Sequence, residues 1–159
     1  MAGPGACQLP ERRAAGVLLY RLDAGGLPRF LLLRHTEGGH WSPPKGHRNA
    51  GETDVEAALR ETIEEAGIAP RSLDPAFRIE IRYQVLRGGR PTPKSVLYLL
   101  GEAAQGEVRL SAEHTEFRWV RPEEIPALIP FENLRRVFAA AAERLSELRA
   151  AGGPGSGRA

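Results

Sequence analysis

Two short apolar runs separated by a glycine-rich turn open the regular part of the chain. AAGVLLYRL begins at Ala14 and RFLLLR begins at Arg29, with the turn signal DAGG at 23–26 between them. Runs of leucine, valine and tyrosine of this length are typical of strands, and the intervening turn favours pairing. We therefore expect two paired strands, followed by a loop from His35 to Gly51.

The segment ETDVEAALRETIEEAG changes to a helical period. Thr53 followed three residues later by Glu56 is a capping-box pattern, and Gly67 is a typical helix stop. These signals predict a helix from Thr53 or Asp54 to Ala66. On a helical wheel, the side expected to pack on a sheet collects Val55, Ala58, Leu59, Thr62, Ile63 and Ala66.

The remaining chain predicts further strands and a second long helix. Alternation predicts a strand in FRIEIRYQV from Phe77, a loop at RGGRPTP, and a strand in KSVLYLLGEA from Lys94. EVRL at 107–110 and EFRWV at 116–120 predict shorter strands, and a helical turn is expected after Pro122. A helix is predicted in ENLRRVFAAAAERLSELRAA from Glu132. Strands interleaved with two helices predict an α/β layered domain.

Length, composition and charge fit one globular domain. The chain has 159 residues, 42% hydrophobic and 26% charged, and we expect a single domain over 13–151 between flexible ends at 1–12 and 152–159. The net charge of +2, without a run of five like charges, argues against a stable nucleic-acid or membrane partner. The single cysteine, Cys7, excludes an intramolecular disulfide, and the absence of a signal-peptide or membrane-span pattern predicts a cytoplasmic setting.

Three glutamates of the predicted helix are candidates for chemistry. Glu61, Glu64 and Glu65 stand at i, i+3 and i+4, so their carboxylates are neighbours that repel one another. One interpretation is a solvated helix face that Arg60 and other bases screen. The other is a site for a divalent cation, because Mg²⁺ prefers oxygen ligands and often bridges carboxylates to substrate phosphates. The three residues alone leave both interpretations open.

The positions around these glutamates resemble the box of the Nudix hydrolase family, G-x5-E-x7-R-E-U-x-E-E-x-G-U, in which U is usually aliphatic. Gly46, Glu52 and the run RETIEEAGI from Arg60 occupy every fixed position of that box. The one departure is Thr62 at the first U, on the side expected to be buried, so it concerns packing and not ligands.

The resemblance implies a Nudix-type α/β/α sandwich with a mixed β-sheet and a loop-helix-loop catalytic motif. It also implies that Glu61, Glu64, Glu65 and the carbonyl of Gly46 bind Mg²⁺, with Mn²⁺ as the alternative. In the catalytic set it implies that Arg60 orients the glutamates, that Glu52 pairs with it, and that Glu64 is the general base, with Glu113 a rival base or further metal ligand.

A second resemblance concerns HWSPPKGH at 40–47, PKSVLYLL at 93–100 and LSAEHTEFRW at 110–119. These segments are similar to the W-S/T-P-P-K-G-H, P-K-S/T-V-x-Y and L-S-x-E-H motifs of the asymmetrical diadenosine tetraphosphate hydrolases. Pro43 and Pro44 restrict the loop, and Lys45 behind them offers a point charge to a phosphate oxygen. His40 and Lys94 are further phosphate candidates.

Aromatic residues complete the expected substrate site. The resemblance implies that Tyr83, with Phe131 as a second candidate, stacks on an adenine ring. Taken singly, lysines of this kind are surface residues and such aromatic residues belong to a core, so their substrate roles depend on the resemblance.

The resulting expectation is a Mg²⁺-dependent pyrophosphohydrolase, monomeric or homodimeric, that cleaves a small dinucleoside polyphosphate. The expected reaction is Ap4A to ATP and AMP by attack of water at phosphorus. One alternative is a diphosphoinositol polyphosphate, a nucleoside triphosphate or an RNA 5′ end as substrate. The first of these needs a dense basic pocket, for which the chain offers Arg34, Arg78, Arg82, Arg87 and Arg90. The other alternative is a nucleotide-binding module without catalysis.

Overall fold

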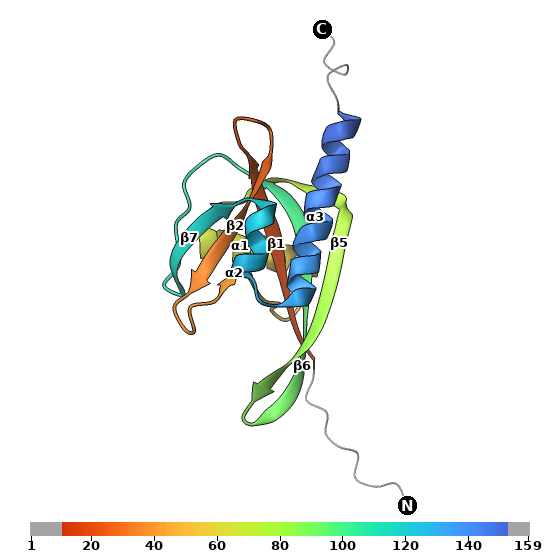
Figure 1. The fold of residues 1–159 in the computed structure, drawn as a ribbon. Helices are drawn as coiled ribbons and strands as arrows, with labels where there is room; N and C mark the ends of the chain where they lie inside the picture. The colour runs from red at the N-terminus through yellow and green to blue at the C-terminus, as the bar shows by residue number, and fades with distance from the viewer. Residues whose placement is uncertain (1–10, 153–159) are drawn as a thin grey trace, which may run out of the picture.

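The two apolar runs form neighbouring antiparallel strands, β1 (Arg12–Leu22) and β2 (Pro28–His35), in a computed structural model that describes residues 11–152 (Figure 1). Tyr20 lies opposite Phe30 in their register. The predicted pairing is therefore confirmed. Cys7 and nearly all of the two ends that were expected to be flexible lie outside the described residues.

The described residues form one mixed sheet in which five strands follow the order β3-β2-β1-β6-β5. β1 and β6 (Arg90–Ala103) are parallel, whereas β5 (Pro70–Arg87) is antiparallel to β6. β3 (Trp41–Ser42) pairs with β2, and β4 (Lys45–His47) pairs with β1. β7 (His114–Val120) pairs with β2.

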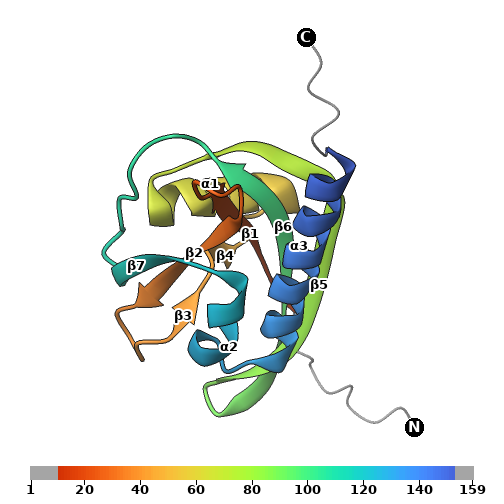
Figure 2. The same ribbon diagram turned by 45° about the horizontal axis from the view of Figure 1, so that its top comes forward.

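Helices cover both faces of this sheet (Figures 1 and 2). Along β1, Ala15, Val17 and Leu19 pack with α1 (Asp54–Ala66). Ala14 and Leu18 point to the other face, where they pack with α3 (Glu132–Ala151). A 3-10 turn (Pro122–Glu124) and α2 (Ile125–Leu128) lead into α3. Two cores on either side of a mixed sheet confirm the predicted α/β/α sandwich.

α1 begins and ends where the sequence predicts. Thr53 and Glu56 form the reciprocal capping box, and Gly67 ends the helix in the left-handed conformation with φ 68°. The predicted packing face is partly wrong, since Ile63 is 50% exposed while Glu65 is only 5% exposed. Small residues allow α1 to lie close to the sheet, and the hydroxyl of buried Thr62 donates to a backbone carbonyl of its own helix.

Three further expectations need correction. The expected loop at 35–51 contains β3 and β4, because its two buried prolines hold short extended pieces against β2 and β1. EVRL at 107–110 is not a strand, although Val108 and Leu110 still pack on the α1 side. The loop predicted at RGGRPTP shrinks to the two glycines 88 and 89, both with positive φ, so β5 and β6 form one long hairpin.

Among residues 11–152, no helix has the length and apolar character to cross a membrane.

The fold predicts that Gly16→Ala is destabilising. A Cβ at Gly16 would overlap the carbonyl oxygen of Pro44 and lie 2.7 Å from the Cβ of Lys45, so β4 would have to move away from β1. We expect a loss of about 1–3 kcal/mol in the free energy of unfolding, measured by urea denaturation. Gly25→Ala, whose Cβ would meet nothing closer than 3.4 Å, is the matched control. Equal stability of the two variants would contradict this view of β4.

Candidate active site

β4 places consecutive residues on opposite faces of the sheet. Gly46 pairs with Ala15 and points toward α1, whereas Lys45 pairs with Gly16 and points toward the α3 side. The backbone N–H of Lys45 donates to the Oε2 atom of Glu65 at 3.0 Å. β4 is thus joined to β1 on one edge and to the acidic helix on the other.

Gly46 and Glu61 are in direct contact. A Cβ added to Gly46 would overlap the whole carboxylate of Glu61, so only glycine fits here. The backbone of β4 and a helical carboxylate can therefore share one small volume, as the loop-helix-loop motif requires.

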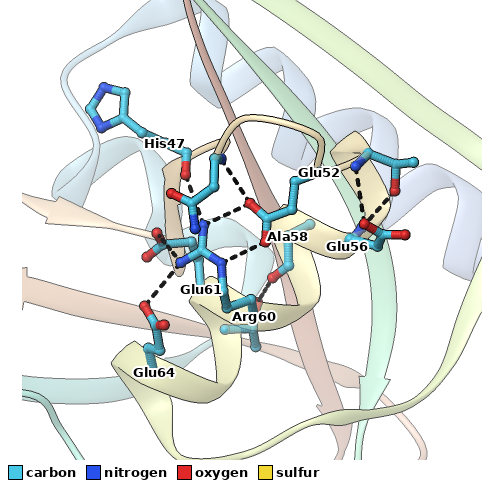
Figure 3. Close-up of polar contacts among 10 residues, drawn as sticks. His47, Glu52, Glu56, Ala58, Arg60, Glu61 and Glu64 are labelled. Carbon is cyan, nitrogen blue, oxygen red and sulfur yellow. Dashed lines mark hydrogen bonds and ion pairs between the residues drawn. The ribbon is translucent and has the colours of Figure 1, made fainter.

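Arg60 organises the acidic face through five contacts (Figure 3). Its guanidinium binds both oxygens of Glu52, at 2.6 and 2.9 Å. It also donates to Glu61 at 2.9 Å, to Glu64 at 3.1 Å, and to the backbone carbonyl of His47 at 2.9 Å. The hydrogen bonds from Arg60 hold the pKa of Glu52 at about 2. The predicted pairing of these two residues is confirmed, and Arg60 also holds the end of β4.

Burial separates the three glutamates of α1. Glu65 is 5% exposed, and burial raises its pKa to about 8. Burial also raises the pKa of Glu61, against the opposing effect of Arg60, while Glu64 stays exposed at the surface. The solvated-face interpretation therefore fits Glu64 alone. Two carboxylates held in a poorly solvated place are suited to bind a cation or a proton.

The donor set fits a divalent cation. Glu61, Glu64 and Glu65 offer carboxylate oxygens, and Gly46 offers a carbonyl in the cradle that a Cβ would fill. Within residues 11–152, no three carboxylate, imidazole or thiol groups already stand together as a metal site. Arg60 already donates to oxygens of Glu61 and Glu64, and the N–H of Lys45 donates to one of Glu65. A cation must compete with these hydrogen bonds.

Glu113 approaches this site from a different part of the chain. Its backbone carbonyl accepts a hydrogen bond from the N–H of Thr36 at 2.8 Å, just before β7 begins. Its charge contributes to the raised pKa values of Glu61 and Glu65, so it lies within electrostatic reach of both. The structure thus brings the second base candidate near α1.

Cations and one aromatic ring lie on the other face of β4. Burial lowers the pKa of Lys45, which the charges of Glu65, Glu61 and Glu113 oppose. Lys94 is directly opposite Tyr83 across the β5–β6 pair, with its Nζ 5.8 Å from the ring centroid. The structure therefore groups three of the predicted substrate residues near each other.

His40 lies within electrostatic reach of these cations, since burial lowers its pKa and the charges of Lys45 and Lys94 add to this effect, whereas Phe131 lies elsewhere. His40 is exposed and stacks on His35 at 4.1 Å between ring centroids, and His35 in turn hydrogen bonds Ser42 at 2.8 Å. Phe131 is 55% exposed at the start of α3, and it makes no ring contact with Tyr83 among the described residues. The sequence analysis missed His35 and buried His114, whose ring lies 4.6 Å from His35, although the LSAEH segment contains the latter.

Comparison with known proteins agrees with this geometry. The model of the NUDIX domain family matches residues 10–142. The chain belongs to the NUDIX family. Because it also carries every fixed position of the box, it is a hydrolase that acts on pyrophosphate bonds.

Its relatives include the asymmetrical bis(5′-nucleosyl)-tetraphosphatase of Mus musculus, 40% identical over 134 residues that cover 77% of this chain and 88% of the relative. The enzyme of the same name from Caenorhabditis elegans is 36% identical over 113 residues, covering 70% of this chain and 80% of the relative. A crystal structure of a C. elegans Ap4A hydrolase binary complex superposes with a TM-score of 0.78 at 31% identity, covering 86% of this chain and 98% of that one.

The Arg60–Glu52 pair predicts an acid-dependent stability difference. The hydrogen bonds from Arg60 hold the pKa of Glu52 at about 2 in the folded protein, below its ordinary value of 4.5. The pair therefore stabilises the fold fully at pH values above 4.5 and loses this effect as the pH falls through about 2. We expect Glu52→Gln to be less stable than the native chain near neutral pH, with the difference shrinking toward low pH in urea titrations. Glu107→Gln, at an exposed position, is the control. A difference that stayed constant to low pH would contradict the assignment.

Proposed function

We propose that this protein is an asymmetrical dinucleoside tetraphosphate hydrolase that cleaves Ap4A to ATP and AMP with Mg²⁺, or Mn²⁺ as the alternative. The observation that carries the proposal is the placement of opposite charges on the two faces of β4. Gly46 meets the acidic face of α1, and Lys45 meets a basic and aromatic surface with Lys94 and Tyr83. The names and coverage of the relatives support the same substrate.

On this proposal, Glu61, Glu64, Glu65 and the carbonyl of Gly46 hold the metal. When bound, the metal supplies charge neutralisation at phosphate and a more acidic water. Arg60 keeps Glu61 and Glu64 oriented through its hydrogen bonds at 2.9 and 3.1 Å.

The reaction itself adds one water across one P–O–P linkage. A carboxylate, Glu64 or Glu113, takes a proton from the water as its oxygen bonds to phosphorus and the bridging bond breaks. The two products, ATP and AMP, account for all atoms of Ap4A and water. Glu64 is exposed next to Arg60, which suits a base that must exchange its proton with solvent.

On this proposal, the basic surface binds the phosphate chain and one adenine of the substrate. A tetraphosphate chain carries about four negative charges, which Lys45, Lys94 and His40 offer to neutralise together with the metal. Tyr83, partly buried against the core, offers one flat face to an adenine ring. Stacking of this kind contributes about 1–3 kcal/mol per base.

The contacts of the arginines argue against an inositol pyrophosphate as substrate. Arg34 pairs with Glu116 at 3.1 Å, and Arg78 pairs with Asp54 at 3.3 Å. Arg82 has two carboxylate neighbours, both at 3.7 Å. These three side chains are therefore partly neutralised and do not form the dense basic pocket that such a substrate needs.

Product analysis tests the proposal. The purified protein with Mg²⁺ is expected to convert Ap4A to ATP and AMP while leaving ATP intact, as resolved by anion exchange beside incubations with Ap6A, an inositol pyrophosphate and ATP. Two ADP molecules would contradict the asymmetrical reaction. Turnover of the inositol pyrophosphate or ATP alone would contradict the substrate and leave the family assignment in place.

The same assay tests the metal site with the variant Glu65→Gln. Glutamine resembles the protonated carboxyl, which the raised pKa of about 8 makes the stable form near neutral pH, so the variant is expected to fold. Loss of a metal ligand is expected to lower kcat/KM by at least about 100-fold. Glu147→Gln, an exposed change on α3, is expected to keep full activity.

Lys94 predicts a pH dependence of substrate binding. Burial lowers the pKa of Lys94 to about 8, and the charges of Lys45 and Arg12 add to this effect. Because a lysine is neutral above its pKa, the KM for Ap4A is expected to rise as pH increases through about 8. Lys94→Arg keeps its charge, so its KM is expected to stay flat over the same range. Parallel KM profiles for the two proteins would remove Lys94 from the binding site.

A further inference from the structure

One row of side chains crosses three neighbouring strands where β1 begins. Arg12 on β1 is paired with Lys94 on β6, and Lys94 is paired with Tyr83 on β5. Directly paired residues carry their side chains on the same face, close enough to interact. The β5–β6 hairpin projects past the start of β1 (Figure 1), and Arg12, Lys94 and Tyr83 are each only partly buried.

The neighbouring row fixes which face this is. Ala14, Val96 and Ile81 form it, and all three belong to the core under α3. Because side chains alternate along a strand, Arg12, two residues before Ala14, points to the same α3 side. His47 joins it there, since it is paired with Ala14.

The register also gives the order of the positive groups. Lys45 lies opposite Gly16, His47 lies opposite Ala14, and Arg12 comes two residues further along β1. Two residues of a strand span about 6.6 Å, so Arg12 lies roughly 13 Å along β1 from the level of Lys45. The basic surface therefore runs away from the acidic helix, whose Glu65 contacts the backbone of Lys45.

Arg12 is half-buried, and its side chain makes no ion pair or hydrogen bond with any group within residues 11–152. Burial is the main cause of the lowered pKa values of Lys94 and His47, and the charge of Arg12 adds to both effects. Gathering uncompensated cations on one surface costs free energy unless a polyanion binds there. This arrangement indicates a place for phosphate groups beyond those that Lys45 reaches.

We infer that Arg12 is a substrate-binding residue that holds a phosphate of the chain distant from the acidic helix, beside the base on Tyr83. The inference rests on the proposed function and deepens it. A residue at the far end of the basic surface contributes only when the polyphosphate chain is long enough to reach it. Arg12 therefore selects a tetraphosphate over shorter chains.

The test compares Arg12→Gln with Arg13→Gln. Arg13 is the adjacent residue, but it points to the α1 side of the sheet, beside Asp54 and Arg78. We expect Arg12→Gln to raise the KM for Ap4A about tenfold or more, because losing a hydrogen bond to a charged group weakens binding by about that factor. The kcat is expected to stay within about twofold of the native value. The KM for Ap3A is expected to change less than about twofold, and Arg13→Gln is expected to match the native chain on both substrates.

Three outcomes would overturn the inference. One is an unchanged KM for Ap4A in Arg12→Gln. Another is an equal rise for Ap3A and Ap4A, which would indicate general electrostatic attraction. The third is an equal rise in Arg13→Gln.

Direct binding separates this inference from the proposed function. If the native protein does not cleave Ap4A, the proposed function fails, and calorimetry with inorganic tetraphosphate then tests Arg12 alone. About tenfold weaker binding in Arg12→Gln, and not in Arg13→Gln, would support the site. Equal affinity in all three proteins would overturn it.

Discussion

The close approach of β4 to both β1 and α1 is the constraint on which the site depends. It requires two glycines, because a side chain at Gly16 would collide with the backbone of Pro44, and one at Gly46 would collide with the carboxylate of Glu61. With both glycines present, three residues of strand connect the sheet to the acidic helix. The two buried prolines before Lys45 then limit how far this strand can move.

Ionisable groups on both sides of β4 are poorly solvated. On the α1 side, burial is the main cause of the raised pKa values of Glu61 and Glu65. On the α3 side, burial lowers the pKa of Lys94 to about 8 and that of His47 to about 4, and neighbouring positive charges add to both shifts. Each side alone is electrostatically costly, and both costs fall when a cation and a polyanion bind together. A site of this kind suits a metal–polyphosphate complex better than either partner alone.

Local signals were sufficient to predict some features. The capping box and Gly67 predicted the start of α1 to within one residue and its end at Ala66, because caps depend on neighbours in sequence. The wheel placed Glu65 with the exposed glutamates, yet it is buried, since the backbone of β4, twenty residues earlier in sequence, covers it. The wheel also placed Ile63 on the buried side, yet it is exposed, because α1 packs through alanines and Thr62.

Arg12 shows more clearly what local sequence signals could not predict. By sequence it belonged to a segment expected to be flexible, and nothing local distinguishes it from Arg13. Only the parallel register of β1 with β6, and then of β6 with β5, places it beside Lys94 and Tyr83. The first of these pairings joins residues more than eighty positions apart, which periodicity within one segment cannot reveal.

Asymmetry of cleavage follows from the same register, on the proposed function. The acidic face meets the basic surface at β4, and the cations continue from there along β1. A symmetric substrate must therefore bind with one end at the carboxylates and the other toward Tyr83. On this proposal water attacks near one end of the chain and not at its centre, because the carboxylates of α1 lie at one end of the basic surface and the binding groups continue away from them.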